Sequence, residues 1–316
     1  MGNNLLDTLE DRLSSDLAKS LPDRDLILEK IDLLKKQRLN IMFVGATGVG
    51  KSSTINAIFD TEVAKVGYSA DPETSVIQKY EIDNMVLWDT PGLGDNPEND
   101  KKYAVDIANT LKEKDNAGNL VIDEVVILVD GSNRDMKTFY EVFENLIVPY
   151  IQDTKRMIIA INQCDLALKG RHWNKEKREP ETPLIDFLDD KVSSIHQRIL
   201  ESTGISTDPI YYSALYHYNI SKLLLTMLKI MPDSKRFLLS DSLNRNPEIW
   251  KKNDSLENYN REIQQEVRGS LTNALSGAAS GASAGQKIGK LIPFIGPVIG
   301  AVVGAILGFL GGMFDE

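Results

Sequence analysis

The stretch "GATGVGKS", residues 45–52, decides the fold that this sequence predicts. It matches the pattern G-x-x-x-x-G-K-[ST], it follows the apolar run "LNIMFVG", and it opens the helical pattern "KSSTINAIF". A strand, a glycine-rich loop and a helix in this order indicate a phosphate-binding loop. Small residues allow backbone amides to surround a phosphate chain, and the helix N-terminus adds a partial positive charge. A glycine-rich turn without a ligand is the alternative, and the flanking elements argue against it.

The side chains of this loop suggest separate roles. Lys51 can reach the β- and γ-phosphates of a nucleotide, and the hydroxyl of Ser52 can ligate Mg²⁺. We expect the remaining phosphate contacts to come from the same stretch of chain. The predicted phosphate-site residues are Gly45, Gly48, Val49, Gly50, Lys51, Ser52 and Ser53.

The segment "LWDTPGLGD" predicts the metal-binding side of the same site. Asp89 ends an apolar strand, where its carboxylate can hold Mg²⁺ through water, and the N–H of Gly92 can contact the γ-phosphate. Loss of that phosphate would then release the loop that follows. A switch of this kind also needs a hydroxyl that caps Mg²⁺ and senses the γ-phosphate. Thr74, just before a strand, is the predicted residue, and Thr61 and Ser75 are the alternatives.

The segment "AINQCDLAL" predicts which base is bound. Asn162 and Asp165 follow an apolar strand, which places them at the edge of a parallel sheet where ligands bind. The carboxylate of Asp165 can accept two hydrogen bonds from N1 and N2 of guanine, whereas adenine offers no such pair of donors. We expect Asn162 to tie this loop to the phosphate loop, and Gln163 to cover the base. In the later segment "YSAL", the Ala214 N–H can meet guanine O6, and Ser213 shapes the turn.

Apolar runs and helical patterns alternate along the chain. This alternation predicts an α/β fold with three layers, in which helices cover both faces of a mostly parallel six-stranded sheet. The runs on either side of Asp83 and Asn84 predict the one antiparallel hairpin. The predicted strands are 39–45, 75–82, 84–90, 124–130, 156–162 and 209–215, and the predicted helices between them are 101–114, 135–150, 184–203 and 216–230.

Composition divides the chain into four predicted parts. The first contains two amphipathic helices separated by Pro22, and the second contains the nucleotide motifs. Within the second part, residues 168–183 are polar and predict a surface insertion whose basic residues form a solvated face. The predicted parts are a helical segment at 1–38, the nucleotide-binding domain at 39–232, a helical linker at 233–268 and a glycine-rich tail at 269–316.

Charge and cysteine content narrow the class of protein. The net charge of −10 argues against a general nucleic-acid binder, so we expect no DNA partner. The single cysteine, Cys164, excludes an intrachain disulfide and fits a reducing compartment. The N-terminus has acidic residues where a signal peptide has an apolar core, so no signal peptide is predicted. The predicted location is the cytoplasm, and the tail raises peripheral or integral attachment at the inner face of a membrane as an alternative.

The tail has a regular glycine spacing. Residues 291–314 contain no charge and are numerous enough to cross a bilayer. Glycines four residues apart share one helix face, which permits the close approach of another helix. The sequence allows a membrane hairpin or span, a buried helical hairpin or a disordered tail, and the flanking Lys287 and Lys290 favour the cytoplasmic side. The spaced glycines are Gly277, Gly281, Gly285, Gly289, Gly296, Gly300, Gly304, Gly308 and Gly312.

Residues 39–232 resemble the small-GTPase superfamily, and more closely the Era-like and YfjP-like bacterial GTPases. Animal immunity-related GTPases share the plan of a helix pair, a G domain and a helical tail. The resemblance implies binding of GTP and GDP with Mg²⁺, and hydrolysis of GTP to GDP and phosphate. It makes Lys51, Thr74 and Gly92 the expected catalytic residues, and Ser52, Thr74 and Asp89 the expected metal site. The motifs that carry it are "GATGVGKSSTINAIF", Thr74, "DTPGLGD", "NQCD" and "YSA".

Two departures from this family predict slow hydrolysis. Leu93 occupies the position of the catalytic Gln of Ras-type proteins, and a Leu cannot orient water. Some Era relatives hold a potassium ion with an Asn at the position of Gly48. We therefore expect a GTP switch with a low intrinsic rate, activated by self-association or a partner and coupled to a membrane or partner through its tail. A membrane-active or pore-forming protein with a regulatory G domain is the alternative, and an ATPase of the same fold is a third.

Overall fold

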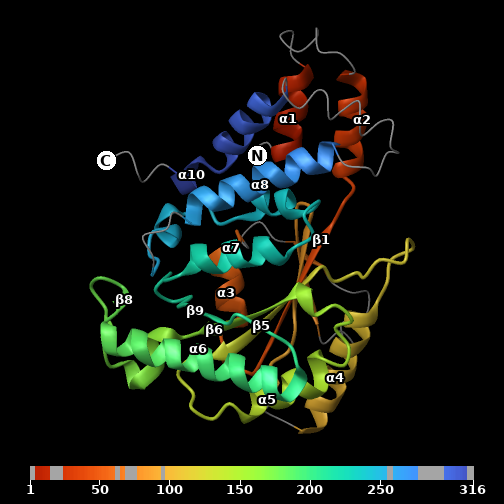
Figure 1. Cartoon of the computed structure of the whole chain (residues 1–316). Coiled ribbons are helices and arrows are strands. Elements are labelled where there is room, and N and C mark those ends of the chain that lie inside the picture. Colours follow the sequence, from red (N-terminus) through yellow and green to blue (C-terminus); the bar gives the residue numbers. More distant parts are fainter. Residues whose placement is uncertain are drawn as a thin grey trace.

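The computed structural model shows an α/β protein with a central sheet and helices on both sides (Figure 1). It describes residues 4–14, 24–60, 65–67, 77–93, 97–254, 259–276 and 295–311. The main sheet has the strand order β2-β3-β4-β1-β5-β6-β9. The predicted fold class is thus confirmed. The strands are β1 (Leu39–Gly45), β2 (Lys65–Gly67), β3 (Gln78–Ile82), β4 (Met85–Asp89), β5 (Glu124–Asp130), β6 (Met157–Asn162) and β9 (Ile210–Tyr211).

The sheet has seven strands rather than the six predicted. All pairings from β4 through β1, β5 and β6 to β9 are parallel. The hairpin β3–β4 is antiparallel as predicted, with Ile82 opposite Met85 and Asp83 in the left-handed region at φ 49°. The additional strand β2 pairs antiparallel with β3. The hairpin of β7 (Trp173–Asn174) and β8 (Glu179–Pro180) lies in the polar insertion, so the prediction of one antiparallel hairpin is wrong.

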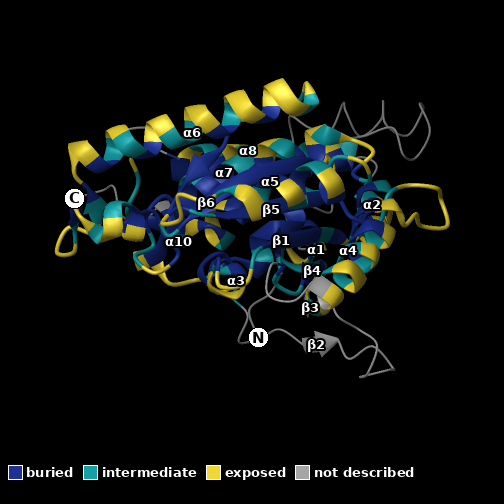
Figure 2. Ribbon diagram, turned by 90° about the horizontal axis from the view of Figure 1, so that it is seen from below, coloured by how far each residue is buried: buried dark blue, intermediate teal, exposed yellow. Residues whose placement is uncertain are grey.

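Alternation along β1 explains why helices cover both faces. Ile41 and Phe43 belong to one hydrophobic cluster, and Met42 and Val44 belong to the other. All four side chains are fully buried, which is typical of a central parallel strand. Figure 2 shows the inner strands in the buried colour and the outer turns of α6 as exposed. The first cluster includes α3 (Lys51–Ile58) and α7 (Ile220–Ile230), and the second includes α4 (Pro97–Lys112), α5 (Lys137–Val142), η3 (Phe143–Ile147) and α6 (Thr182–Thr203).

A further helical layer packs outside α7 (Figure 1). Its side chains belong to the same hydrophobic cluster as one face of the sheet, so the core is continuous from the sheet to the ends of the chain. The helix α8 crosses residue 269, where the tail is predicted to begin, and the boundaries of the four parts stay predictions. The elements of this layer are α1 (Leu5–Ser14), α2 (Arg24–Leu34), η6 (Arg236–Ser242), η7 (Pro247–Trp250), α8 (Tyr259–Ser276), a helix at 295–306 and α10 (Gly308–Gly311).

The C-terminal segment 295–311, which contains the helix at 295–306 and α10, docks through its aliphatic face. Ile299, Val302 and Leu307 are buried against this layer. A Cβ added at Gly296, Gly304 or Gly308 would have no other described atom within 4 Å, whereas one at Gly300 would lie 3.3 Å from Cζ of Arg268, so the glycines contribute little to this contact. Within the described ranges, no helix combines the length and hydropathy that a membrane crossing requires. The predicted tail residues 277–294 and 312–316 lie outside the described part of the chain.

Asp241, near the end of η6, joins this element to the N-terminal helix α1. Its Oδ1 accepts a hydrogen bond of 2.8 Å from the backbone N–H of Leu5, the first residue of α1. Burial raises the pKa of Asp241 from 3.8 to about 7; Asp83 and Asp7 contribute to the rise, and Arg245 and the Leu5 N–H oppose it.

This pKa predicts a stability that depends on pH. Between pH 3.8 and about 7, the folded protein binds more protons at Asp241 than the unfolded chain does, so stability falls as pH rises. The substitution Asp241→Asn retains the acceptor oxygen and removes the charge. We expect it to raise Tm by about 2–4 °C at pH 8 and to leave Tm unchanged at pH 4, measured by thermal unfolding. Asp32→Asn, on an exposed position of α2, is the control, and an equal effect of both variants at pH 8 would contradict the assignment.

Candidate functional site

Two cavities open side by side at the edge of the sheet where the parallel strands end. The first has a volume of about 590 Å³, the second has a volume of about 610 Å³, and both are lined by Gly50 and Ser53. The first cavity receives Lys51, Ser52 and Asp89 from the predicted phosphate and metal motifs. The second cavity receives the predicted base-site residues, which are Asn162, Gln163, Asp165 and Ala214.

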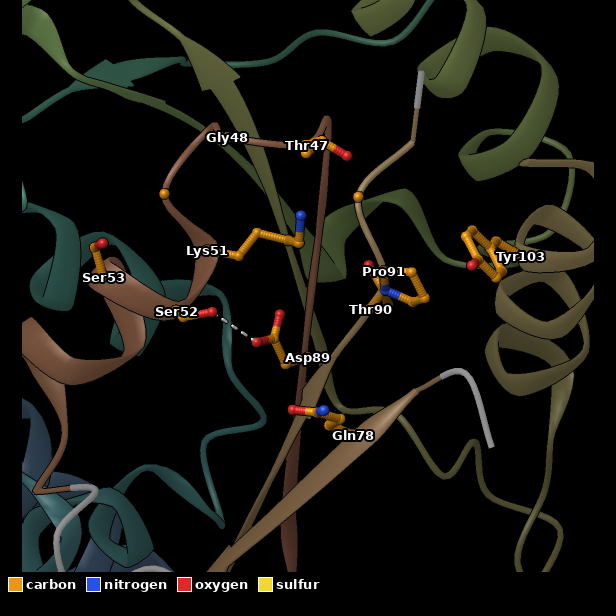
Figure 3. A pocket seen from close by; sticks show the side chains of 12 residues that line it. Thr47, Gly48, Lys51, Ser52, Ser53, Gln78, Asp89, Thr90, Pro91 and Tyr103 are labelled. Atoms are coloured by element: carbon orange, nitrogen blue, oxygen red, sulfur yellow. Dashed lines mark hydrogen bonds between the residues drawn. The ribbon is translucent and has the colours of Figure 1, made fainter. Parts of the chain in front are cut away.

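The first cavity collects charged and hydroxyl groups (Figure 3). The Nζ of Lys51 donates to the carbonyl oxygens of Gly45 and Ala46, each at 3.2 Å. The Oγ of Ser52 donates to Oδ2 of Asp89 at 3.1 Å. Burial raises the pKa of the Asp89 carboxyl, and the hydroxyl of Ser52 and the charge of Lys51 offset part of the rise. These groups surround the space above the N-terminus of α3.

The second carboxylate oxygen of Asp89 marks a place for a cation. This Oδ1 is buried and has no hydrogen-bond partner among the described residues. A buried carboxylate oxygen without a partner is costly, and a divalent cation held by oxygen ligands removes that cost. In the described ranges, no group of three or more His, Cys, Asp and Glu side chains is placed to hold a metal ion.

The segment after Asp89 lies directly on the phosphate loop. The N–H of Leu93 donates to the Gly45 carbonyl at 3.3 Å, and the N–H of Thr47 donates to the Leu93 carbonyl at 3.2 Å. A Cβ added at Gly92 would lie 2.1 Å from Oγ1 of Thr47, so only a glycine allows this approach. Movement of the phosphate loop therefore reaches the Gly92 segment through direct backbone contacts.

Asn162 holds the second cavity together. Its Nδ2 donates to the Val49 carbonyl at 2.9 Å, and its Oδ1 accepts from the Ala214 N–H at 3.0 Å. This is the tie to the phosphate loop that the sequence predicts. A Cβ added at Gly50 would lie 2.3 Å from that Nδ2, and Gly50 has φ +89°, which other residues rarely adopt. The lack of space and the backbone conformation both require glycine at this position.

The other base-side residues surround a buried acid. Asp165 is 3% exposed, and its Oδ1 has no hydrogen-bond partner in the described part of the chain. The Nε2 of Gln163 donates to the Gly48 carbonyl at 2.9 Å. Ser213 shapes its turn by accepting at Oγ from the Tyr216 N–H at 3.2 Å. The Ala214 N–H is bonded to Asn162 here, so its predicted contact with guanine O6 stays a prediction.

The structure adds residues that the motifs did not indicate. Thr47, Gln78 from β3 and Tyr103 from α4 line the first cavity (Figure 3). Asn246 and Ile249 line the second, from a segment far beyond the motifs. Thr47 occupies a variable position of the phosphate-loop motif, whereas the other four stand in no recognisable pattern and reach the site by tertiary packing. Thr74, with its alternatives Thr61 and Ser75, lies outside the described residues.

Comparison with known proteins identifies the class. The family model of 50S ribosome-binding GTPases matches residues 40–163. The tRNA modification GTPase MnmE of Marinomonas sp. (strain MWYL1) is 28% identical over 140 residues, which cover 43% of this chain and 29% of MnmE. GTPase Era of Alkaliphilus metalliredigens (strain QYMF) is 24% identical over 213 residues, which cover 66% of this chain and 61% of Era. The chain contains a P-loop GTPase domain.

Two solved structures are similar to part of the chain. A probable GTP-binding protein engB is 22% identical, with a TM-score of 0.38 over 60% of this chain and 97% of that one. The G domain of the T. maritima FeoB iron transporter is 18% identical, with a TM-score of 0.36 over 61% of this chain and 99% of that one. The chain spans less than two thirds of the length of MnmE and of Era.

P-loop GTPases bind GTP or GDP with Mg²⁺, and the residues of this domain fit those ligands. The unpartnered Oδ1 of Asp89 can ligate a metal ion, and the unpartnered Oδ1 of Asp165 can accept hydrogen bonds from the paired donors of guanine.

Cys164, between Gln163 and Asp165, is fully buried. Burial, and secondarily the charge of Asp165, raises the pKa of its thiol well above the ordinary value, which argues against a role as a nucleophile.

The bonds of Asn162 predict a large effect of its removal. Asn162→Ala leaves the Val49 carbonyl and the Ala214 N–H without partners in a buried region. We expect a loss of about 2–3 kcal/mol in the free energy of unfolding, measured in urea, together with weaker guanine-nucleotide binding. Gln163→Ala is the matched control, because it removes one exposed hydrogen bond from the neighbouring residue. Equal stability of the two variants would show that Asn162 does not hold the loops together.

Proposed function

We propose that this protein is a molecular switch that binds GTP with Mg²⁺ and hydrolyses it slowly to GDP and phosphate. The observation that carries the proposal is the pair of buried carboxylates, one of which lines each of the two adjacent cavities. Asp89 lies beside Ser52 and Lys51, and Asp165 lies beside Asn162. One acid suits a cation at the phosphates, and the other suits a guanine edge.

The chain's own groups supply binding, orientation and charge. Lys51 would leave the carbonyls of Gly45 and Ala46 to bind the β- and γ-phosphates, and Ser52 and Asp89 would hold the cation directly or through water. Mg²⁺, when bound, offsets negative charge that develops on the phosphates. The N–H of Gly92 would bind the γ-phosphate, and Thr74 would complete the metal site.

The proposed rate is low because the position after Gly92 offers no polar group. Leu93 is 4% exposed and lies in a hydrophobic cluster. A Leu side chain cannot orient the attacking water, so we propose that self-association or a partner supplies the missing group. Turnover per molecule that stays constant as protein concentration rises would contradict activation by self-association.

Nucleotide competition tests the proposal. We expect GTP with Mg²⁺ to bind more tightly than ATP, and EDTA to weaken GTP binding. Asp165→Ala should weaken GTP binding by about 100-fold, because two hydrogen bonds to a charged group are lost, and should reduce the preference over ATP. Lys51→Ala should weaken binding of both triphosphates. Asp208→Ala, a change outside both cavities, is the control. Equal affinity for ATP and GTP in the unchanged protein would contradict the guanine assignment.

We also propose that the tail couples the switch to a membrane or a partner. The charge-free stretch 291–314 supports this proposal, and the docked position of 295–311 implies that the tail must leave the helical layer before it inserts. We expect liposome binding to differ between GDP and a non-hydrolysable GTP analogue, measured by flotation, and Lys51→Ala to abolish the difference. If Lys51→Ala binds liposomes as strongly as the unchanged protein does, the result would favour the alternative of a membrane-active protein in which the G domain is only a scaffold.

A further inference from the structure

Residues 243–250, which we call the wall segment, lie between the base-side cavity and the C-terminal helix. Asn244, Asn246 and Ile249 line the cavity together with Asp165. The wall segment lies outside residues 40–163, the part that matches the GTPase family model. The cavity that we assign to the nucleoside is therefore completed by a part of the chain beyond the matched region.

The wall segment is attached to the helix that follows the phosphate loop. Leu243 forms a β-bridge with Phe59, just after the end of α3. The N–H of Asn244 donates to the Ile58 carbonyl at 2.9 Å, and its Nδ2 donates to the Asn56 carbonyl at 3.1 Å. Because α3 begins at Lys51, these bonds fix the wall segment relative to the phosphate loop.

The other side of the wall segment holds the C-terminal helix. The guanidinium of Arg245 donates to the Ile306 carbonyl and lies 5.1 Å from the ring centroid of Phe309. The ring of Trp250 lies 6.2 Å from the same ring. Positive charge at a helix C-terminus is favourable, so Arg245 stabilises the end of the helix at 295–306.

A hydrogen bond from Trp250 joins the two sides of the wall segment. The indole Nε1 of Trp250, which contacts the tail, donates to the carbonyl of Asn244, which lines the cavity, at 2.9 Å. Trp250 is fully buried, so it cannot move without disturbing its neighbours. Loss of the Phe309 contact would loosen Trp250 and, through this bond, the cavity wall.

We propose that the wall segment contacts the nucleoside of the bound guanine nucleotide, and that docking of the segment 295–311 holds the wall in its binding position. The inference rests on the proposed binding of guanine nucleotides. The Oδ1 of Asn246 accepts from the Glu248 N–H, which leaves its Nδ2 to donate to a ribose hydroxyl, and Ile249 offers an apolar surface to the sugar and base. Docking of the tail and binding of the nucleotide are then coupled, and each strengthens the other by the same factor.

Two variants test separately how the tail-facing side and the cavity-facing side of the wall segment contribute to nucleotide binding. Phe309→Ala removes the ring contacts to Trp250 and Arg245 without touching the cavity, and Asn246→Ala removes a side chain that lines the cavity, together with its bond to the Glu248 N–H. Ala305→Ser, on an exposed position of the same tail helix, is the matched control. The affinity of the full chain for a fluorescent GDP derivative is measured by titration. We expect Phe309→Ala and Asn246→Ala each to weaken binding by about fivefold or more, and the control to bind normally.

Hydrogen exchange tests the coupling in the unchanged protein, even where a variant does not fold. We expect GDP to slow amide exchange at 299–310, and Asn246→Ala to reduce that protection at equal saturation with GDP. If GDP binds but leaves exchange at 299–310 unchanged, the coupling is wrong while the proposed guanine-nucleotide binding stands. If Phe309→Ala folds and binds GDP as the unchanged protein does, the positioning role of the tail is wrong. If GDP does not bind the unchanged protein, both the inference and the proposed function fail.

Discussion

The side chain of Asn162 is the constraint on which the nucleotide pocket depends. One amide group satisfies the Val49 carbonyl in the phosphate loop and the Ala214 N–H after the last strand. Both bonds lie in a buried region, where an unpaired polar group costs the most. The same amide occupies the space that any side chain at Gly50 would need. The hydrogen bonds of Asn162 therefore require a glycine at position 50. These bonds also hold the two cavities in a fixed relative position.

Much of the fold and the site could be predicted because the evidence in the sequence was local. A parallel sheet brings the ends of β1, β4 and β6 to one edge, so motifs that directly follow apolar strands must meet there. The short elements gave no such signal. A strand of three residues, such as β2, shows no alternation, and the pairing that creates it depends on β3. The wall segment and Tyr103 reach the site by tertiary packing, which no spacing in the sequence indicates.

The tail shows how two patterns on one helix compete. Glycines at intervals of four and aliphatic residues at helical spacing occupy different faces of 295–311. The glycine spacing predicted the close approach of another helix, whereas the described contacts use Ile299, Val302 and Leu307. Burial of large apolar side chains stabilises this layer by more than glycine contacts would in water. The continuous core also explains why division by composition placed a boundary inside α8.

The buried thiol of Cys164 has a practical consequence. It is the sole cysteine of the chain, and it lies in the loop that follows β6, shielded by the surrounding protein. A protonated, inaccessible thiol reacts with alkylating reagents only when its surroundings open. The rate at which an alkylating reagent labels Cys164 therefore reports how often this loop opens, and the measurement needs no attached probe and no substitution.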